Sequence, residues 1–500
     1  MYDLLIKGGL IIDGTGNEPY YANLAISGGK ISLITNEAPH ANEIIRAEGL
    51  VVAPGFIDSH SHSDRHFISH PDQREKAEQG ITYSIAGQCG SSAAPYRSDT
   101  GIVTAGEFLN KVRDIPQGSG ASMFVGFNSV RSAVMGAENR APTKDELKQM
   151  QELVREAMRA GALGLSLGLL YVPGCYATTD EVVAVASVVR EFDGLLASHI
   201  RSESDTFLES VEEYIHIIKA TGCRAVFSHH KASGKPHWGE VKKSIAMIEE
   251  AISEGYDIYL DVYPYVASHT GLSSTYLPNR FHKDGMKSVL EILEDRNLLD
   301  IIKASRFKRN GTDYSWTLIT YAEGHPEYVG KNLNEICEMR GDSDPVESAF
   351  AIIKETGNRS SACYFTMCEE DVEYVMAHPR AMICTDSASL GDNTSCHPRL
   401  RGSFPRVLGR YVRERGVTTL AEMIRKMTSL PARVYKLSTK GEIKCGMDAD
   451  ICIFNPNTII DRADFASPTL KNEGLDYVII SGRVVVKDGV YNGVRAACVR

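Results

Sequence analysis

The chain lacks the features that mark several large classes of protein. Its 500 residues contain no apolar segment long enough to cross a membrane and no recognisable signal peptide. Lys and Arg are fewer than Asp and Glu, and the net charge of −10 argues against nucleic acid or an anionic membrane as partner. The 11 cysteines are irregularly spaced, so we expect reduced thiols and a cytoplasmic protein rather than a disulfide framework.

Fingerprints of organic cofactors are also missing. The sequence contains no GxxxxGK[ST] phosphate loop and no haem, flavin or nicotinamide motif, which disfavours a redox role. The composition, 43% hydrophobic and 24% charged, is typical of a globular protein and gives no sign of disorder. The length exceeds what one ordinary core holds, so we expect one large domain and one small one.

Both ends of the chain show the pattern of short strands. Runs rich in β-branched residues, separated by glycine turns, occur in YDLLIKGGLIIDGTG near the N-terminus and in LDYVIISGRVVVKDGVYNG near the C-terminus. Because the two ends share this texture, we expect residues 1–53 and 436–500 to pair into one small β-sandwich domain.

Residues 54–435 alternate between short apolar runs and helical segments. A clear helix is expected over 143–161, where Thr143 and Glu146 fit a capping box and Gly161 ends the pattern. The alternation predicts a (β/α)₈ barrel, whose active site lies at the C-terminal ends of its strands. The strands are expected at residues 55–62, 82–89, 122–128, 163–169, 195–200, 225–230, 257–263 and 381–386.

One connection is much longer than the others. From Tyr265 to about Cys363 the chain makes an excursion that contains helical pieces such as SVLEILED. Connections of this length usually carry function, so we expect an insertion over the barrel mouth, with a lid-like part at about 279–345.

Residue types that bind metals recur where the predicted strands end. In GFIDSHSHSD the two histidines are one residue apart, so both face the same side of a strand and one metal could bridge them. A lone HxH pair is weak evidence, and each other residue could be an inert thiol or a hydrogen-bonded core side chain. Their convergence at strand ends carries the metal hypothesis. The residues are His60, His62, Cys89, His199, His229 or His230, and Asp386.

The pattern also predicts a chemistry. Strand alternation places Lys231 on the same side as His229, where an ammonium suits an anionic substrate group, although a solvated rim lysine is the alternative. A zinc held by two histidines and a cysteine lowers the pKa of bound water to about 7 and polarises a carbonyl oxygen. Asp386 would take a proton from that water and pass it to a leaving amine. The sequence therefore predicts a hydrolase for an amide-like bond.

These motifs resemble a known family along nearly the whole chain. PGFIDSHSH and the terminal GEIKCGMDADICIF are similar to those of the amidohydrolase superfamily. More narrowly, GITYSIAGQCG, SHIRSE, SHHKASG, DVYPY and HPRLRGSFPRVLG resemble the N-acyl-D-amino-acid deacylases, or D-aminoacylases. The resemblance implies zinc-dependent hydrolysis of N-acyl-D-amino acids, in which metal-activated hydroxide attacks the acyl carbonyl and Asp386 acts as general base and then general acid.

The resemblance also implies roles for individual residues. A tightly held zinc would be bound by Cys89, His199 and His229, and a second, weaker metal by His60, His62 and Asp386. The substrate carboxylate would be bound by Lys231 and Tyr263, the acyl or side-chain pocket would be lined by Tyr171, and a further charge contact would come from Arg399. One departure is that Ser387 follows Asp386, where glycine is common in the superfamily.

Two alternatives stay open at this stage. A cyclic-amide hydrolase of the hydantoinase or dihydropyrimidinase type is disfavoured, because strand four reads LGLSLGL and lacks the lysine that those relatives carboxylate. A non-catalytic scaffold on the same fold would be expected to lose metal ligands, whereas this chain retains them. The expected partner is a small N-acyl-D-amino acid, without nucleic acid or membrane. A homo-oligomer and the preferred side chain are left undecided.

Overall fold

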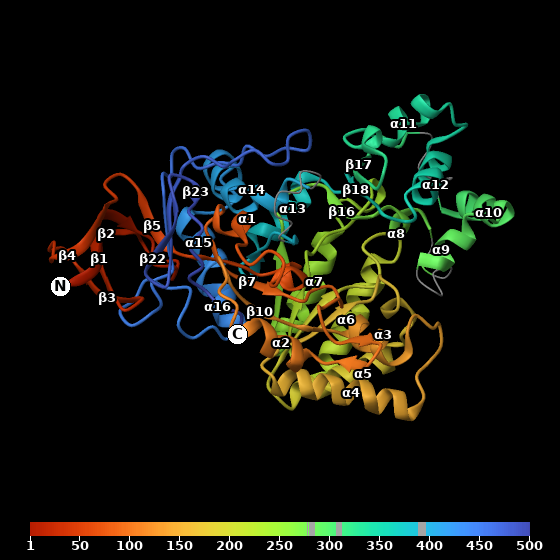
Figure 1. Ribbon diagram of the computed structural model, residues 1–500, viewed down its shortest axis with the longest axis horizontal. Helices are drawn as coiled ribbons and strands as arrows, with labels where there is room; N and C mark the ends of the chain where they lie inside the picture. The colour runs from red at the N-terminus through yellow and green to blue at the C-terminus, as the bar shows by residue number, and fades with distance from the viewer. Residues whose placement is uncertain (278, 280–285, 307–312, 389–396) are drawn as a thin grey trace.

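The computed structural model describes residues 1–277, 279, 286–306, 313–388 and 397–500, and a parallel barrel forms its centre (Figure 1). Parallel pairing runs from β6 through β7 to β10, and from β11 through β12, β13, β14 and β15 to β19. The barrel strands are β6 (Phe56–Asp58), β7 (Ile81–Ala86), β10 (Gly120–Met123), β11 (Val125–Gly126), β12 (Gly164–Gly168), β13 (Leu195–His199), β14 (Arg224–Phe227), β15 (Ile258–Val262) and β19 (Ala381–Ile383).

Backbone hydrogen bonds join the two paired groups of strands. The N–H of Ser59 donates to the carbonyl of Ile383 at 3.3 Å, which links the first strand to the last, and the N–H of Leu163 donates to the carbonyl of Met123 at 3.0 Å. The predicted run 122–128 is divided at Phe124, whose N–H donates to Ala86 of the neighbouring strand at 2.9 Å. The predicted (β/α)₈ barrel is confirmed, with its third strand in two pieces.

Helix α4 (Lys144–Arg159) shows how the sequence sets the outer layer. The side chain of Thr143 accepts a hydrogen bond from the N–H of Glu146 at 3.2 Å, and Glu146 accepts one from the N–H of Thr143 at 2.7 Å, so the expected capping box is present. Apolar residues at helical spacing, among them Met150 and Val154, pack this helix into the core. Similar helices cover the strands around the barrel: α5 (Thr179–Arg190), α6 (Phe207–Thr221), α7 (Val241–Ser253), α13 (Glu369–Ala377) and α15 (Leu420–Met427).

The two ends of the chain meet in one sheet, at the left of Figure 1. Antiparallel pairing of β5 with β20 joins the N-terminal strands to the C-terminal ones, which confirms that both termini build one β unit. The exact boundaries at 53 and 436 stay predictions. The strands are β1 (Tyr2–Ile11), β2 (Tyr20–Ser27), β3 (Lys30–Thr35), β4 (Ala41–Arg46), β5 (Val51–Pro54), β20 (Ile451–Phe454), β21 (Leu475–Ile480), β22 (Arg483–Lys487) and β23 (Val490–Tyr491).

The long connection after β15 builds a separate unit. Its strands pair in the order β16, β18, β17, and its helices pack on a core of their own that includes Tyr276, Leu333 and Phe350. The expected lid at about 279–345 falls within this unit, although 280–285 and 307–312 lie outside the described residues, and its lid role stays a prediction. The elements are β16 (Ser268–Gly271), α8 (Leu272–Tyr276), α9 (Met286–Ile292), α10 (Arg296–Arg306), β17 (Thr317–Ala322), α11 (Leu333–Arg340), α12 (Pro345–Glu355) and β18 (Ser360–Tyr364).

None of the helices in the described part of the chain combines the length and apolarity needed to span a bilayer.

Candidate functional site

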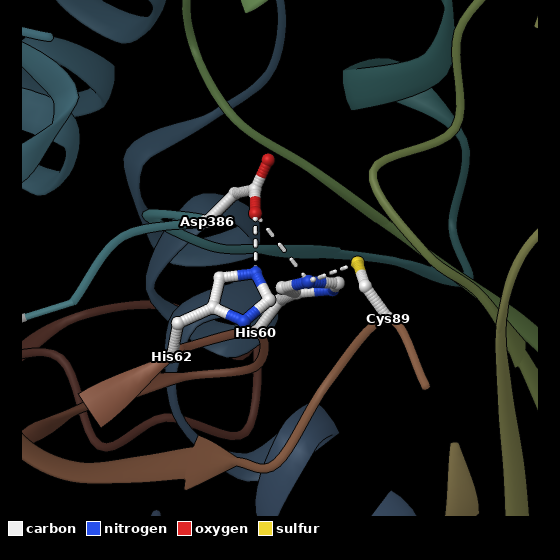
Figure 2. A group of neighbouring side chains, drawn as sticks. All are labelled: His60, His62, Cys89 and Asp386. Atoms are coloured by element: carbon white, nitrogen blue, oxygen red, sulfur yellow. Dashed lines mark hydrogen bonds and ion pairs between the residues drawn. The ribbon is translucent and has the colours of Figure 1, made fainter. Parts of the chain in front are cut away.

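Six predicted ligands meet at the C-terminal ends of the barrel strands. Ligand atoms of His60, His62, Cys89 and Asp386 lie within 4.8 Å of one another. Figure 2 shows these four side chains pointing toward one another. A second group, Cys89, His199 and His229, meets the same limit. The Sγ atom of Cys89 lies 3.3 Å from Nε2 of His60 and 3.2 Å from Nε2 of His229. The two groups are therefore neighbours that share the cysteine.

Three of these residues have left-handed backbone, which is uncommon for residues other than glycine. The φ angles are 53° at Cys89, 35° at His229 and 47° at Asp386. Each of the three comes two or three residues after the end of a barrel strand, where the chain turns out of the sheet. Such conformations cost about 1–3 kcal/mol each and persist only where the surrounding structure enforces them. Hydrogen bonds from the backbone hold two of these residues in place. The N–H of His229 donates to Oδ1 of Asp261 at 2.6 Å, and the N–H of Asp386 donates to the carbonyl of His60 at 2.9 Å.

The loop that carries Cys89 is held by a buried carboxylate. Asp64 accepts hydrogen bonds from the N–H groups of Gly87, at 3.3 Å, and Ala93, at 2.6 Å. Gly90 has a φ of 74°, and a Cβ atom there would lie 2.3 Å from Oδ1 of Asn128. The GQCG motif therefore ends its strand in a tight turn that directs the thiol inward.

The donor set suits a zinc ion. Both ring nitrogens of His199 are buried, and neither has a hydrogen-bond partner among the residues that the structure describes. Buried polar atoms without a partner are costly, and a metal would satisfy one of these nitrogens. Cysteine sulfur and histidine nitrogen are the usual zinc ligands in proteins. The residues present could therefore hold zinc at Cys89, His199 and His229, with His60, His62 and Asp386 as a second set.

The charges around the site shift the pKa values of these residues in both directions. Burial alone would raise the pKa of Cys89, but the positive charges of His60 and His229 hold the thiol pKa well below its usual value. For Asp386, burial is likewise outweighed, first by Arg399 and then by His229, so its pKa lies well below the usual range. His62 is shifted the other way: hydrogen bonds with Asp386 and Cys89 outweigh burial and raise its pKa to about 9.

The predicted substrate-binding residues face the same cleft, whose volume is about 2060 Å³. Tyr171 lies with its ring centroid 4.8 Å from that of His199. Two cations lie over the ring of Tyr263. Nζ of Lys231 is 5.6 Å from the ring centroid, and Cζ of Arg399 is 4.7 Å from it. Arg399 begins α14 (Arg399–Arg406), and its Nη1 lies 2.8 Å from Oδ2 of Asp386, a partner that the sequence did not indicate.

Two carboxylates beside the ligands were missed by sequence reasoning. Asp261, fully buried on β15, lies 3.4 Å from Nδ1 of His60 through its Oδ1 atom and holds the N–H of His229. Glu203 accepts a hydrogen bond from Nζ of Lys231 at 2.6 Å. Burial alone would raise the pKa of Glu203, but Lys231 and then His199 lower it. Asp261 is the first residue of DVYPY and Glu203 is the last residue of SHIRSE. Their place in these two motifs is the sequence feature that could have indicated a role at the site.

A buried lysine explains the departure at Ser387. Lys76, on α1 (Arg74–Ala77), donates to Oδ2 of Asp58 at 2.7 Å, to Oγ1 of Thr385 at 2.7 Å and to the carbonyl of Ser387 at 3.2 Å. The hydroxyl of Ser387 donates to Oγ1 of Thr385 at 2.9 Å, so the serine side chain belongs to this network. The network joins the first barrel strand to the last beside Asp386.

Comparisons with known proteins show a family and several relatives that this chain is similar to. The model of a family described as "Amidohydrolase family" matches residues 43–486. D-aminoacylase of Alcaligenes xylosoxydans xylosoxydans is 33% identical over 99% of this chain and 96% of its own length, and N-acyl-D-glutamate deacylase of the same organism is 34% identical over 97% and 93%. The crystal structure of N-acyl-D-glutamate deacylase from Bordetella bronchiseptica, complexed with zinc and a phosphonate inhibitor, superposes with a TM-score of 0.85 at 34% identity, covering 100% of this chain and 99% of that one.

Proposed function

Because this chain belongs to the amidohydrolase family, we propose that it is an N-acyl-D-amino-acid deacylase, which hydrolyses the amide bond and releases a carboxylate and the free D-amino acid. The observation that carries the proposal is the pair of ligand groups that share Cys89 in one cleft with Lys231 and Arg399. Relatives that align along nearly the whole chain and act on N-acyl-D-amino acids support it.

The proposal assigns a tightly held zinc to Cys89, His199 and His229 and a weaker second metal to His60, His62 and Asp386. When bound, zinc supplies Lewis acidity, which lowers the pKa of water at the site and polarises an amide carbonyl. The lowered pKa of the buried Cys89 thiol supports the first assignment, and so do the ring nitrogens of His199, which have no hydrogen-bond partner among the described residues.

Asp386 is assigned the proton transfer. Its pairing with Arg399 keeps it ionised, so that a carboxylate oxygen is available to accept a proton from the attacking water. The protonated carboxyl would then donate that proton to the leaving amine nitrogen. Lys231 and Tyr263 are assigned to the substrate carboxylate, where the ammonium would pair with it and the phenol would donate a hydrogen bond.

Amine release from a panel of N-acetyl-D- and N-acetyl-L-amino acids tests the proposal on the zinc-loaded protein. We expect turnover of at least one D substrate and much slower turnover of its L enantiomer. If no D substrate is hydrolysed by protein that contains stoichiometric zinc, the proposal is wrong.

Ring opening of hydantoin and dihydrouracil, measured beside this panel, tests the cyclic-amide alternative. The geometry disfavours it, since Ser166 on β12 is engaged by the Cys89 loop: its hydroxyl donates to Gly87 O at 2.6 Å and accepts from the N–H of Gly90 at 3.1 Å. A lysine that could be carboxylated does not occur on that strand.

A further inference from the structure

One oxygen of Glu203 lies at the junction between the metal-binding histidines and the substrate-facing lysine. Its Oε1 atom is 2.6 Å from Nζ of Lys231, 3.2 Å from Nδ1 of His229 and 3.6 Å from Nε2 of His199. The carboxylate is 11% exposed and Lys231 is 8% exposed, so water screens these contacts weakly. The backbone is fixed as well, because Glu203 O accepts a hydrogen bond from the N–H of Ser233 at 2.6 Å.

Donor and acceptor roles at His229 follow from its surroundings. Its Nε2 faces Sγ of Cys89, so the metal-facing nitrogen is Nε2 and a neutral ring carries its proton on Nδ1. Two groups lie near that N–H, the Glu203 carboxylate and the ammonium of Lys231, whose Nζ is 2.9 Å away. An ammonium has no acceptor, so of these two groups it is Glu203 that can accept the proton of Nδ1.

The same counting leaves one donor of Lys231 free. The ammonium has three N–H groups, one of which donates to Glu203 at 2.6 Å and one to His229 O at 3.1 Å. A protonated Nδ1 cannot accept the third, and the described residues offer it no other acceptor, so it is left for a ligand in the cleft that Lys231 lines. Without the carboxylate, the ammonium and the Nδ1–H would lie side by side with no negative charge between them.

We propose that Glu203 is a positioning residue with two roles: it accepts the Nδ1 proton of the zinc ligand His229, and it holds Lys231 with one N–H directed at the substrate carboxylate. The role toward Lys231 and the substrate rests on the proposed function. The role toward His229 depends only on the positions of the residues. Carboxylates that accept the second proton of a metal-bound histidine orient the ring and raise its basicity.

The test compares Glu203→Gln, which keeps the shape and removes the charge, with Lys231→Met. Glu209→Gln, an exposed position on the neighbouring helix α6, is the matched control. Zinc affinity is measured by chelator competition without substrate, and KM and kcat are measured with the best N-acyl-D-amino acid. Melting temperatures are recorded for every variant, and Glu203→Asp is made as well.

For Glu203→Gln we expect zinc affinity about 10- to 100-fold lower and KM about 10- to 100-fold higher, since a hydrogen bond to a charged group is lost. Lys231→Met should raise KM in the same way but bind zinc at least as tightly as wild type, because it removes a positive charge beside the ligand. Glu209→Gln should change neither quantity.

Wild-type zinc affinity and KM in Glu203→Gln would overturn the inference, and so would weakened zinc binding in Lys231→Met. If Glu203→Gln does not fold, Glu203→Asp decides. We expect it to lower zinc affinity and to raise KM, and wild-type values of both would contradict the inference. If the wild type hydrolyses no N-acyl-D-amino acid, the proposed function fails, whereas the zinc measurements still test Glu203.

Discussion

Replacing Lys76 by Met should destabilise the seam of the barrel. Lys76 and Asp58 are fully buried, and their ion pair of 2.7 Å is the contact that compensates the Asp58 charge at the junction of β6 and β19. Removal of the ammonium leaves a carboxylate in the interior without its counter-charge. Breaking a buried pair in this way costs about 3–5 kcal/mol, a large part of the 5–15 kcal/mol or so by which a typical protein is stable.

The assay is urea unfolding, followed by fluorescence, of Lys76→Met and of the double variant Lys76→Met/Asp58→Asn. The amide keeps an acceptor for the N–H of Thr385, which lies 2.8 Å from Oδ1 of Asp58, and introduces no charge. We therefore expect the double variant to recover most of the lost stability. Lys148→Met, at an exposed position on α4, is the control. A single variant as stable as wild type, or a double variant less stable than the single one, would refute the reasoning.

Three further predictions concern the cleft. Cys89→Ala, which removes the ligand shared by both groups, should abolish stoichiometric zinc binding, and retained zinc by elemental analysis would contradict this. Asp386→Asn should keep zinc but lower kcat by about 10²- to 10⁴-fold, and an unchanged kcat would remove its proton-transfer role. His269, on β16, has its pKa lowered from 6.5 to about 4 by burial and then by Arg399. The unfolded chain therefore binds this proton first, and stability is lost as pH falls from 6.5 towards 4, at no more than about 1.4 kcal/mol per pH unit. His269→Gln should lack that slope in urea unfolding at several pH values, and an identical slope in both proteins would contradict the assignment.

The barrel was predictable because its sequence pattern is local. Capping boxes such as the one between Thr143 and Glu146, and apolar runs of five or six residues, depend on neighbours along the chain. The split of the third strand at Phe124 was not predictable, because it depends on a hydrogen bond to Ala86 across the sheet. The separate sheet and core of the insertion could not be predicted either, because short sequence motifs do not show which distant residues pack together.

The candidate ligands could also be predicted individually from the sequence. Their residue types occur at strand ends, and parallel strands end at the same rim of a barrel. The sequence separated Cys89 from the HxH pair, whereas the structure places its sulfur 3.3 Å from His60, so both groups share it. Arg399 was expected at the substrate, and the structure pairs it with Asp386. Its role toward the substrate stays a prediction.

By itself, then, the sequence determined the alternation of strands and helices and the set of metal-binding residue types, since both follow from chemistry within a few neighbouring residues. Only the tertiary structure decided which groups compensate one another: Lys76 with Asp58, Glu203 with Lys231, and Asp261 with His60. The partners in these pairs are 18, 28 and 201 residues apart by their numbers in the chain. A charge buried in a core is stable only beside its partner, and folding alone brings such partners together.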